Sequence, residues 1–83
     1  MPHFVYLLRC NDNTIYCGYT NNLEKRIEVH NSGKGSKYTR GRRPVKLIYV
    51  EECLSKSVAL KREYTLKQLP RGKKEELIKL KLN

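Results

Sequence analysis

The first twenty residues predict a β-hairpin. Residues 4–10 and 14–20 are rich in aromatic and β-branched side chains, which is typical of strands. The intervening Asn11, Asp12 and Asn13 are turn residues, because their side chains bond the nearby backbone and tolerate positive φ. With 83 residues the chain has room for one domain, spanning residues 1–83, and for only a thin core.

The length of this turn sets which side chains share a face. A turn over residues 11–13 pairs Leu8 with Tyr16 and Tyr6 with Gly18, so that both tyrosines point to the same side of the hairpin. A slip of one residue would put the two tyrosines on opposite faces. We expect the first register. Gly18 opposite Tyr6 then leaves space above the ring for a ligand or a backbone to approach.

A helix is expected to follow the hairpin, with Asn21 as its N-cap and Glu24 three residues later. The helix should end near His30 or Asn31, before Gly33 and Gly35. Residues 31–43 have no apolar periodicity and predict a mobile basic loop with room for one short helical turn.

The second half of the chain predicts one strand and two helices. Residues 45–50 form an apolar run that favours a third strand at the centre of the sheet. Ser55 or Ser57 can cap a helix over residues 56–69, which Pro70 ends, and residues 73–80 continue as a last helix. The order β-β-α-β-α-α predicts an α/β chain of the α+β type, with a small three-stranded antiparallel sheet flanked by helices.

The charge of the chain points to a polyanionic partner. Eighteen Lys and Arg oppose eight Asp and Glu, which gives a net charge of +10, and residues 31–50 contain no acidic residue. Clustered charge of one sign favours nucleic acid over a merely soluble surface, and no segment pairs the apolar and basic faces that a membrane surface would need. The predicted nucleic-acid contacts are Lys34, Lys37, Arg40, Arg42, Arg43 and Lys46.

The three cysteines do not indicate a disulfide framework or a zinc site. Cys10, Cys17 and Cys53 are odd in number and lack metal-ligand spacing. No apolar stretch resembles a signal peptide or a membrane span. We therefore expect a reduced, soluble, monomeric protein of the cytoplasm.

The first helix carries polar residues where apolar ones are expected. Leu23, Arg26, Ile27 and His30 share one face. Arginine offers a planar set of donors for phosphate oxygens, and histidine can orient a neighbour, bind a phosphate or move a proton. Alternatively, Arg26 reaches out to solvent and His30 is a hydrogen-bonded, partly buried histidine.

The second predicted helix places Glu63 on one face with Ala59 and Leu66. A carboxylate in an apolar stripe is costly unless a cation meets it, and both Arg26 and a divalent metal are candidates. A single Glu can hold Mg²⁺ only if substrate phosphate and water complete the coordination shell. Both interpretations of Glu63, as the ion-pair partner of Arg26 and as a ligand of a divalent metal, stay open.

Together these residues resemble the GIY-YIG endonuclease superfamily. Val5-Tyr6 and Tyr16-Cys17-Gly18 are similar to the two halves of its signature, although Phe4-Val5-Tyr6 replaces Gly-Ile-Tyr and Cys17 replaces Ile. Arg26, His30 and Glu63 fall, in order, where members carry functional residues. The likeness covers nearly the whole chain and is greatest to the small stand-alone bacterial proteins with a single domain.

This resemblance implies metal-dependent hydrolysis of phosphodiester bonds with one Mg²⁺ or Mn²⁺; DNA is favoured over RNA as the substrate, and the choice between them stays open. Tyr6 or Tyr16 would act with water as the base, and cationic neighbours such as Arg26 would help the phenol ionise. Arg26 would stabilise the transition state, His30 would assist, and Glu63 would bind the metal. The supporting residues are Gly18, Tyr19 and Lys67.

Two departures from the superfamily pattern leave a second function open. Tyr19 stands where other branches have a Lys, and the C-terminal Asn of other members has no counterpart after Glu63. The alternative is a catalytically weak or inactive nucleic-acid-binding module of the same fold. A ribosome- or RNA-associated basic protein ranks last, because size and charge alone favour it.

Overall fold

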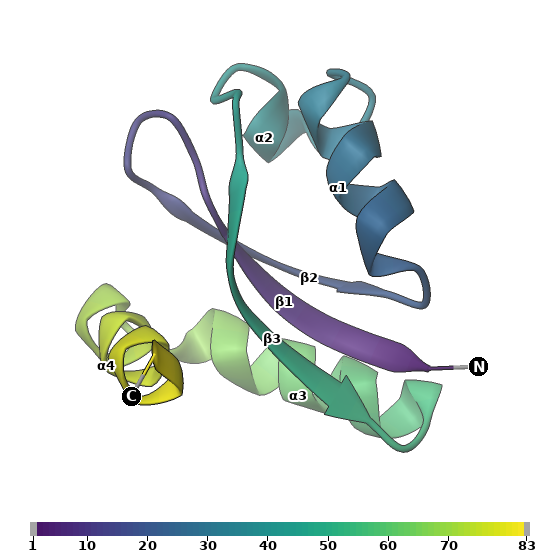
Figure 1. Cartoon of the computed structure of the whole chain (residues 1–83). Coiled ribbons are helices and arrows are strands. Elements are labelled where there is room, and N and C mark those ends of the chain that lie inside the picture. The colour runs from purple at the N-terminus through teal and green to yellow at the C-terminus, as the bar shows by residue number, and fades with distance from the viewer. Residues whose placement is uncertain (1, 83) are drawn as a thin grey trace.

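The computed structural model describes residues 2–82 and contains a three-stranded antiparallel sheet with helices on both faces (Figure 1). This confirms the predicted fold class. A short helix inside the predicted basic loop is the one addition to the predicted order. The elements are β1 (His3–Arg9), β2 (Ile15–Thr20), α1 (Leu23–Asn31), α2 (Lys37–Arg40), β3 (Lys46–Cys53), α3 (Lys56–Gln68) and α4 (Arg71–Leu82).

The hairpin has the predicted register. Tyr6 pairs with Gly18 and Leu8 pairs with Tyr16 across β1 and β2. The turn is closed by a hydrogen bond from the Cys10 amide to the Thr14 carbonyl oxygen, at 2.9 Å, and Asn13 has a φ of 70°. An asparagine tolerates this left-handed conformation because its short side chain can bond locally. The turn residues therefore place both tyrosines on one face of the sheet.

The strand order β2-β1-β3 corrects one prediction, because residues 45–50 do not form the central strand. β1 is central, and its residues from Val5 to Leu8 are all buried. A central strand is covered on both faces, so its consecutive side chains are all withdrawn from water. β3 instead lies at an edge and has exposed positions at Lys46 and Glu52.

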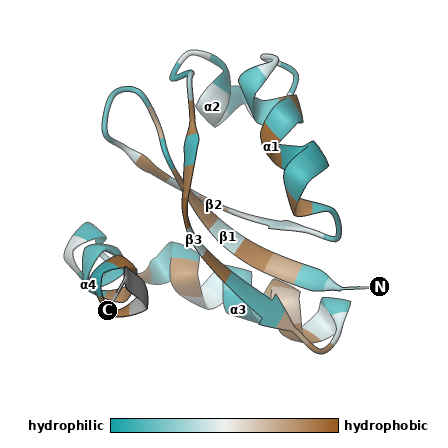
Figure 2. Cartoon of the chain, viewed as in Figure 1, coloured by the Kyte–Doolittle hydropathy of each residue, from teal (hydrophilic) through white to brown (hydrophobic). Residues whose placement is uncertain are grey.

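The sheet divides the hydrophobic core into two layers. α1 and α2 lie over one face, and α3 and α4 lie over the other (Figure 1). Figure 2 shows the hydrophobic residues concentrated along β1 and on the helix surfaces that face the sheet. The core on the α3 side contains Val5, Leu7, Cys17, Tyr49, Ala59, Leu66 and Ile78. The core on the α1 side contains Tyr6, Leu8, Cys10 and Val45, with Tyr16, Leu23 and Ile27 packed against it.

The helix boundaries differ from the predicted ones by one or two residues. Asn22, not Asn21, is the N-cap of α1, and its Oδ1 accepts a hydrogen bond from the Lys25 amide at 3.2 Å. Ser55 rather than Ser57 caps α3. α4 begins before residue 73, because the Pro70 carbonyl oxygen already accepts the amide hydrogen bonds of its first turn.

All three cysteines are free thiols, of which Cys10 and Cys17 are buried and Cys53 is half-buried. Within residues 2–82, none of the helices has the length and apolar character needed to cross a membrane.

Candidate active site

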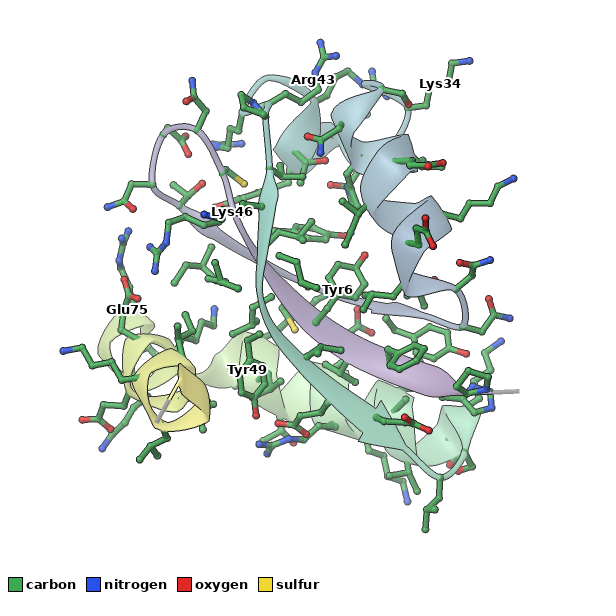
Figure 3. All side chains as sticks on the ribbon, in the orientation of Figure 1. Tyr6, Lys34, Arg43, Lys46, Tyr49 and Glu75 are labelled. Carbon is green, nitrogen blue, oxygen red and sulfur yellow. The ribbon has the colours of Figure 1, made fainter. Side chains whose placement is uncertain are left out.

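Tyr6, Tyr16 and His30 meet in the layer between the sheet and α1. The Tyr6 hydroxyl lies 3.0 Å from His30 Nε2, and the ring centres of Tyr16 and His30 are 5.1 Å apart. Tyr6 and His30 are fully buried, while Tyr16 is half-buried. Figure 3 shows Tyr6 extending from β1 towards α1. The hairpin register and the helical face of His30 together produce this cluster.

Gly18 makes room for the Tyr6 ring rather than for a ligand, which corrects the predicted role of the glycine. A Cβ at residue 18 would lie 2.5 Å from the Tyr6 hydroxyl and 2.6 Å from the ring carbon that carries it. Separations this short are severe overlaps. The space opposite Tyr6 is thus filled by its own side chain, which crosses over β2.

We expect Gly18→Ala to destabilise the protein by about 1–3 kcal/mol, because the added methyl group must displace a fully buried ring. Urea unfolding followed by circular dichroism measures the change. Gly41→Ala is the matched control, since a Cβ there meets no atom within 4 Å. Equal stability of the two variants would contradict the packing of Tyr6 against Gly18.

Thr39 holds the other nitrogen of His30 and was missed by the sequence analysis. Its Oγ1 lies 2.9 Å from His30 Nδ1 and 3.2 Å from the Ser36 carbonyl oxygen. Because that carbonyl can only accept, the Thr39 hydroxyl donates to it and accepts from His30 Nδ1–H. His30 Nε2 then accepts the Tyr6 proton. The sequence contains only a weak signal for Thr39, namely a serine three residues earlier that can cap a helix. Ser36 is the N-cap of α2, and its Oγ accepts a hydrogen bond from the Thr39 amide at 3.2 Å.

Gly35 was also missed, although it packs directly on His30. A Cβ at residue 35 would lie 2.5 Å from His30 Nδ1 and 2.9 Å from its Cα. The segment between α1 and α2 therefore covers the imidazole closely, and any side chain at this position would displace the ring.

Burial keeps both partners of the Tyr6–His30 hydrogen bond neutral. Desolvation raises the pKa of Tyr6 to about 12, although the nearby Arg26 guanidinium acts in the opposite direction. Desolvation, followed by the Arg26 charge, lowers the pKa of His30. Arg26 favours the ionised phenol, but in the free protein burial outweighs its effect. Tyr6 is a proton donor here and His30 is an acceptor.

The lowered pKa of His30 predicts a loss of stability on acidification. The unfolded chain binds a proton near pH 6.5, whereas the folded protein binds it only at lower pH. The free energy of unfolding should therefore fall below about pH 6.5, by up to about 1.4 kcal/mol per pH unit. Urea unfolding at pH 7.5 and pH 5.5 tests this, with His30→Gln as the control that should flatten the dependence. A wild-type protein equally stable at both pH values would contradict it.

Arg26 and Glu63 lie within electrostatic range of Tyr6. The Nε of Arg26 is buried and has no hydrogen-bond partner within the described part of the chain. The charge of Glu63 contributes to the raised pKa of Tyr6, although α3 covers the opposite face of the sheet. Its side chain is 18% exposed and pairs with Lys67, at 3.4 Å from Nζ to Oε2. Lys67 rather than Arg26 is thus the ion-pair partner of Glu63.

The donor set fits a divalent cation only in part. No group of three or more His, Cys, Asp or Glu side chains that could hold a metal occurs among residues 2–82. Glu63 is a single, partly exposed carboxylate whose ion-pair partner, Lys67, is itself half-exposed. One oxygen ligand suits Mg²⁺, which keeps most of its waters and takes further oxygens from phosphate. Glu63 therefore fits a cation that binds together with its substrate.

Tyr19 and most of the predicted nucleic-acid contacts lie outside the cluster of Tyr6, Tyr16 and His30. Tyr19 lies on the α3 face, away from Tyr6, and its hydroxyl is 2.9 Å from His3 Nδ1. Lys46 begins the edge strand β3 and is exposed. The exposed residues on or beside α2 are Lys34, Lys37, Arg40 and Arg43.

Arg42 occupies a structural position. Its Nε lies 2.9 Å from Asp12 Oδ2 in the hairpin turn, and its Nη1 donates to the Tyr38 carbonyl oxygen at 2.7 Å. Its guanidinium also lies 4.2 Å from the centre of the Tyr38 ring, which in turn is 5.8 Å from the Tyr16 ring. Arg42 therefore connects the hairpin turn to the aromatic residues at the edge of the site, and its charge is met by a carboxylate.

Comparison with known proteins shows the family of the chain. The GIY-YIG catalytic domain family matches residues 2–76. A UPF0213 protein of Oceanobacillus iheyensis is 55% identical over 76 residues, which is 92% of this chain and 88% of that protein. The UPF0213 protein YazA of Bacillus subtilis is 52% identical over 81 residues, covering 98% and 82% of the two chains.

A solved structure is similar as well. The solution NMR structure of a UPF0213 protein from Bacillus halodurans superimposes with a TM-score of 0.64 at 49% identity, covering 98% of this chain and 86% of that one. The match spans the sheet and the helices that carry the tyrosines, His30 and Glu63. The chain belongs to the GIY-YIG family, and the three similar proteins named above are UPF0213 proteins.

Proposed function

We propose that the protein is a metal-dependent endonuclease that hydrolyses phosphodiester bonds in DNA. The observation that carries the proposal is the hydrogen bond from the Tyr6 hydroxyl to His30 Nε2, beside an Arg26 Nε that is buried without a partner among residues 2–82. A buried unpaired donor is costly unless an acceptor arrives, and phosphate oxygens are strong acceptors. This arrangement combines a proton acceptor and an anion ligand at one place.

The proton route follows from the hydrogen-bond directions. Neutral His30 accepts at Nε2 because Thr39 engages its Nδ1–H. Tyr6 is fully buried in the free protein, so in this proposal substrate binding must first open its hydroxyl to the attacking water. The phenol can then take the water proton only as it passes its own to His30, since a phenol with a pKa of about 12 is not ionised beforehand. Tyr16 is the tyrosine that solvent reaches, so it orients the attacking water. Tyr6 is thus assigned as the base, with His30 as the final proton acceptor.

Arg26 and Glu63 supply the electrostatic part of the reaction. A guanidinium placed at the phosphate stabilises the negative charge that develops on the equatorial oxygens. Glu63 would hold a divalent cation, which when bound acts as a Lewis acid towards phosphate oxygen. In the free protein this carboxylate pairs with the Lys67 ammonium group, which would have to give way to a bound cation.

A cleavage assay tests the function directly. Purified protein is incubated with labelled branched, single-stranded and duplex DNA, and with RNA of the same sequences, in Mg²⁺, in Mn²⁺ or in EDTA. We expect cleavage of at least one DNA in either metal and none in EDTA, because Glu63 alone cannot supply the Lewis acid. Salt-dependent binding without cleavage of any substrate would instead favour the nucleic-acid-binding module.

A further inference from the structure

Arg43 is held in place without a carboxylate partner among residues 2–82. Its Nε donates to the Arg40 carbonyl oxygen at 2.9 Å, and its Nη1 lies 3.5 Å from the Asn31 carbonyl oxygen. Gly33, with a φ of 84°, allows the guanidinium to approach so closely that a Cβ would lie 2.9 Å from Nη1. Two carbonyls and a glycine thus orient this side chain, and its full positive charge remains available.

The contrast with the neighbouring arginine is informative. Arg42 forms an ion pair with Asp12, but no carboxylate in the described part of the chain pairs with Arg40 or Arg43. An oriented, unneutralised guanidinium offers parallel N–H donors that suit an oxyanion. The preorganised Arg43 therefore has the chemistry of an anion ligand.

A pocket opens at this place. Its volume is about 480 Å³, and it is lined by Asn31, Arg40, Gly41, Arg43 and Pro44. Gly41 contributes no side chain to this lining, and a Cβ at this residue would meet no atom within 4 Å. Figure 3 shows Arg43 and Lys34 at the same end of the molecule, beyond Tyr6. The pocket combines two guanidinium groups with access from solvent.

We propose that this pocket binds one backbone phosphate of the nucleic acid, flanking the phosphate that is cut. The inference rests on the proposed function. Asn31, which lines the pocket, is the last residue of α1, and the same helix carries Arg26. A nucleic-acid strand that reaches Arg26 can therefore continue along α1 to the Arg43 pocket.

Binding of a labelled oligonucleotide at several salt concentrations tests the pocket. All proteins carry Glu63→Gln, so that cleavage does not interfere. We expect Arg40→Gln with Arg43→Gln to lower the slope of log affinity against log salt by about one, and affinity by about fivefold to tenfold at about 0.1 M salt. Lys61→Gln with Lys79→Gln is the matched control, because it removes the same charge from exposed positions on α3 and α4.

The outcomes separate the two proposals. If the parent binds with a salt-dependent affinity but the pocket variant and the control are equally affected, the phosphate pocket is wrong and the nuclease proposal stands. If the parent shows no salt-dependent binding, both are wrong. If the loss of Arg43 disturbs folding, the single variant Arg40→Gln still tests the pocket. Arg43 bonds to the backbone carbonyl of Arg40, and this variant keeps that carbonyl. It should lower the slope measurably, and an unchanged slope would refute the pocket.

Discussion

We expect Glu63→Gln to lower the rate of DNA cleavage by about a thousandfold or more. The substitution keeps the size of the side chain but removes the charge that binds a divalent cation, and metal stabilisation of the transition state is worth several kcal/mol. Because the carboxylate is partly exposed and its partner Lys67 lies on the surface, folding should be little affected. Single-turnover cleavage at saturating Mg²⁺ measures the effect.

Glu76→Gln is the matched control for this prediction. Glu76 is an exposed glutamate on α4 that also pairs with a lysine, Lys73, at 3.6 Å. The control should cleave like the wild type, and both variants should bind DNA at least as tightly as the wild type, because each removes a negative charge. Wild-type cleavage by Glu63→Gln would show that Glu63 does not hold the metal.

We expect Tyr6→Phe to slow cleavage by about 10²–10⁴-fold, which is the usual contribution of a general base. The variant removes only the hydroxyl that donates to His30, so the packing against Gly18 is kept. Some stability should also be lost, about 1–3 kcal/mol, because a buried nitrogen of His30 is left without a partner. Single-turnover rates compared at equal folded fraction separate the two effects.

Two other tyrosines serve as controls for this second prediction. Tyr64→Phe alters a tyrosine on α3 that is 69% exposed and should leave the rate unchanged. Tyr16→Phe should reduce the rate less than Tyr6→Phe, because Tyr16 orients water, whereas the hydrogen bond to His30 Nε2 comes from Tyr6. A larger loss for Tyr16→Phe would assign the role of base to Tyr16 instead.

Much of the candidate site was predictable because it depends on local chemistry. The turn at residues 11–13 specifies the hairpin register, which puts Tyr6 opposite Gly18 and on the same face as Tyr16. Helical periodicity puts Arg26 and His30 on the side of α1 that faces the sheet. These relations join residues close in sequence. The turn residues, the alternation of side chains along a strand and the 3.6-residue period of a helix are therefore sufficient to predict them.

The rest depended on contacts between distant residues. No local pattern shows that β1 rather than β3 is the central strand, since both are apolar runs. The position of a strand in the sheet depends on whether helices cover both of its faces, which is decided only by tertiary packing. Thr39 reaches His30 only because α2 folds back over the end of α1.

The protonation state of Tyr6 shows most clearly what the sequence determines and what only the tertiary structure determines. From its amino-acid sequence the chain specifies a tyrosine, a histidine and an arginine on facing surfaces. Whether Tyr6 ionises depends on how much water reaches it, and the complete burial of the phenol outweighs the favourable charge of Arg26. Desolvation is a sum over every neighbour that excludes water, so it exists only once the sheet and α1 have packed together.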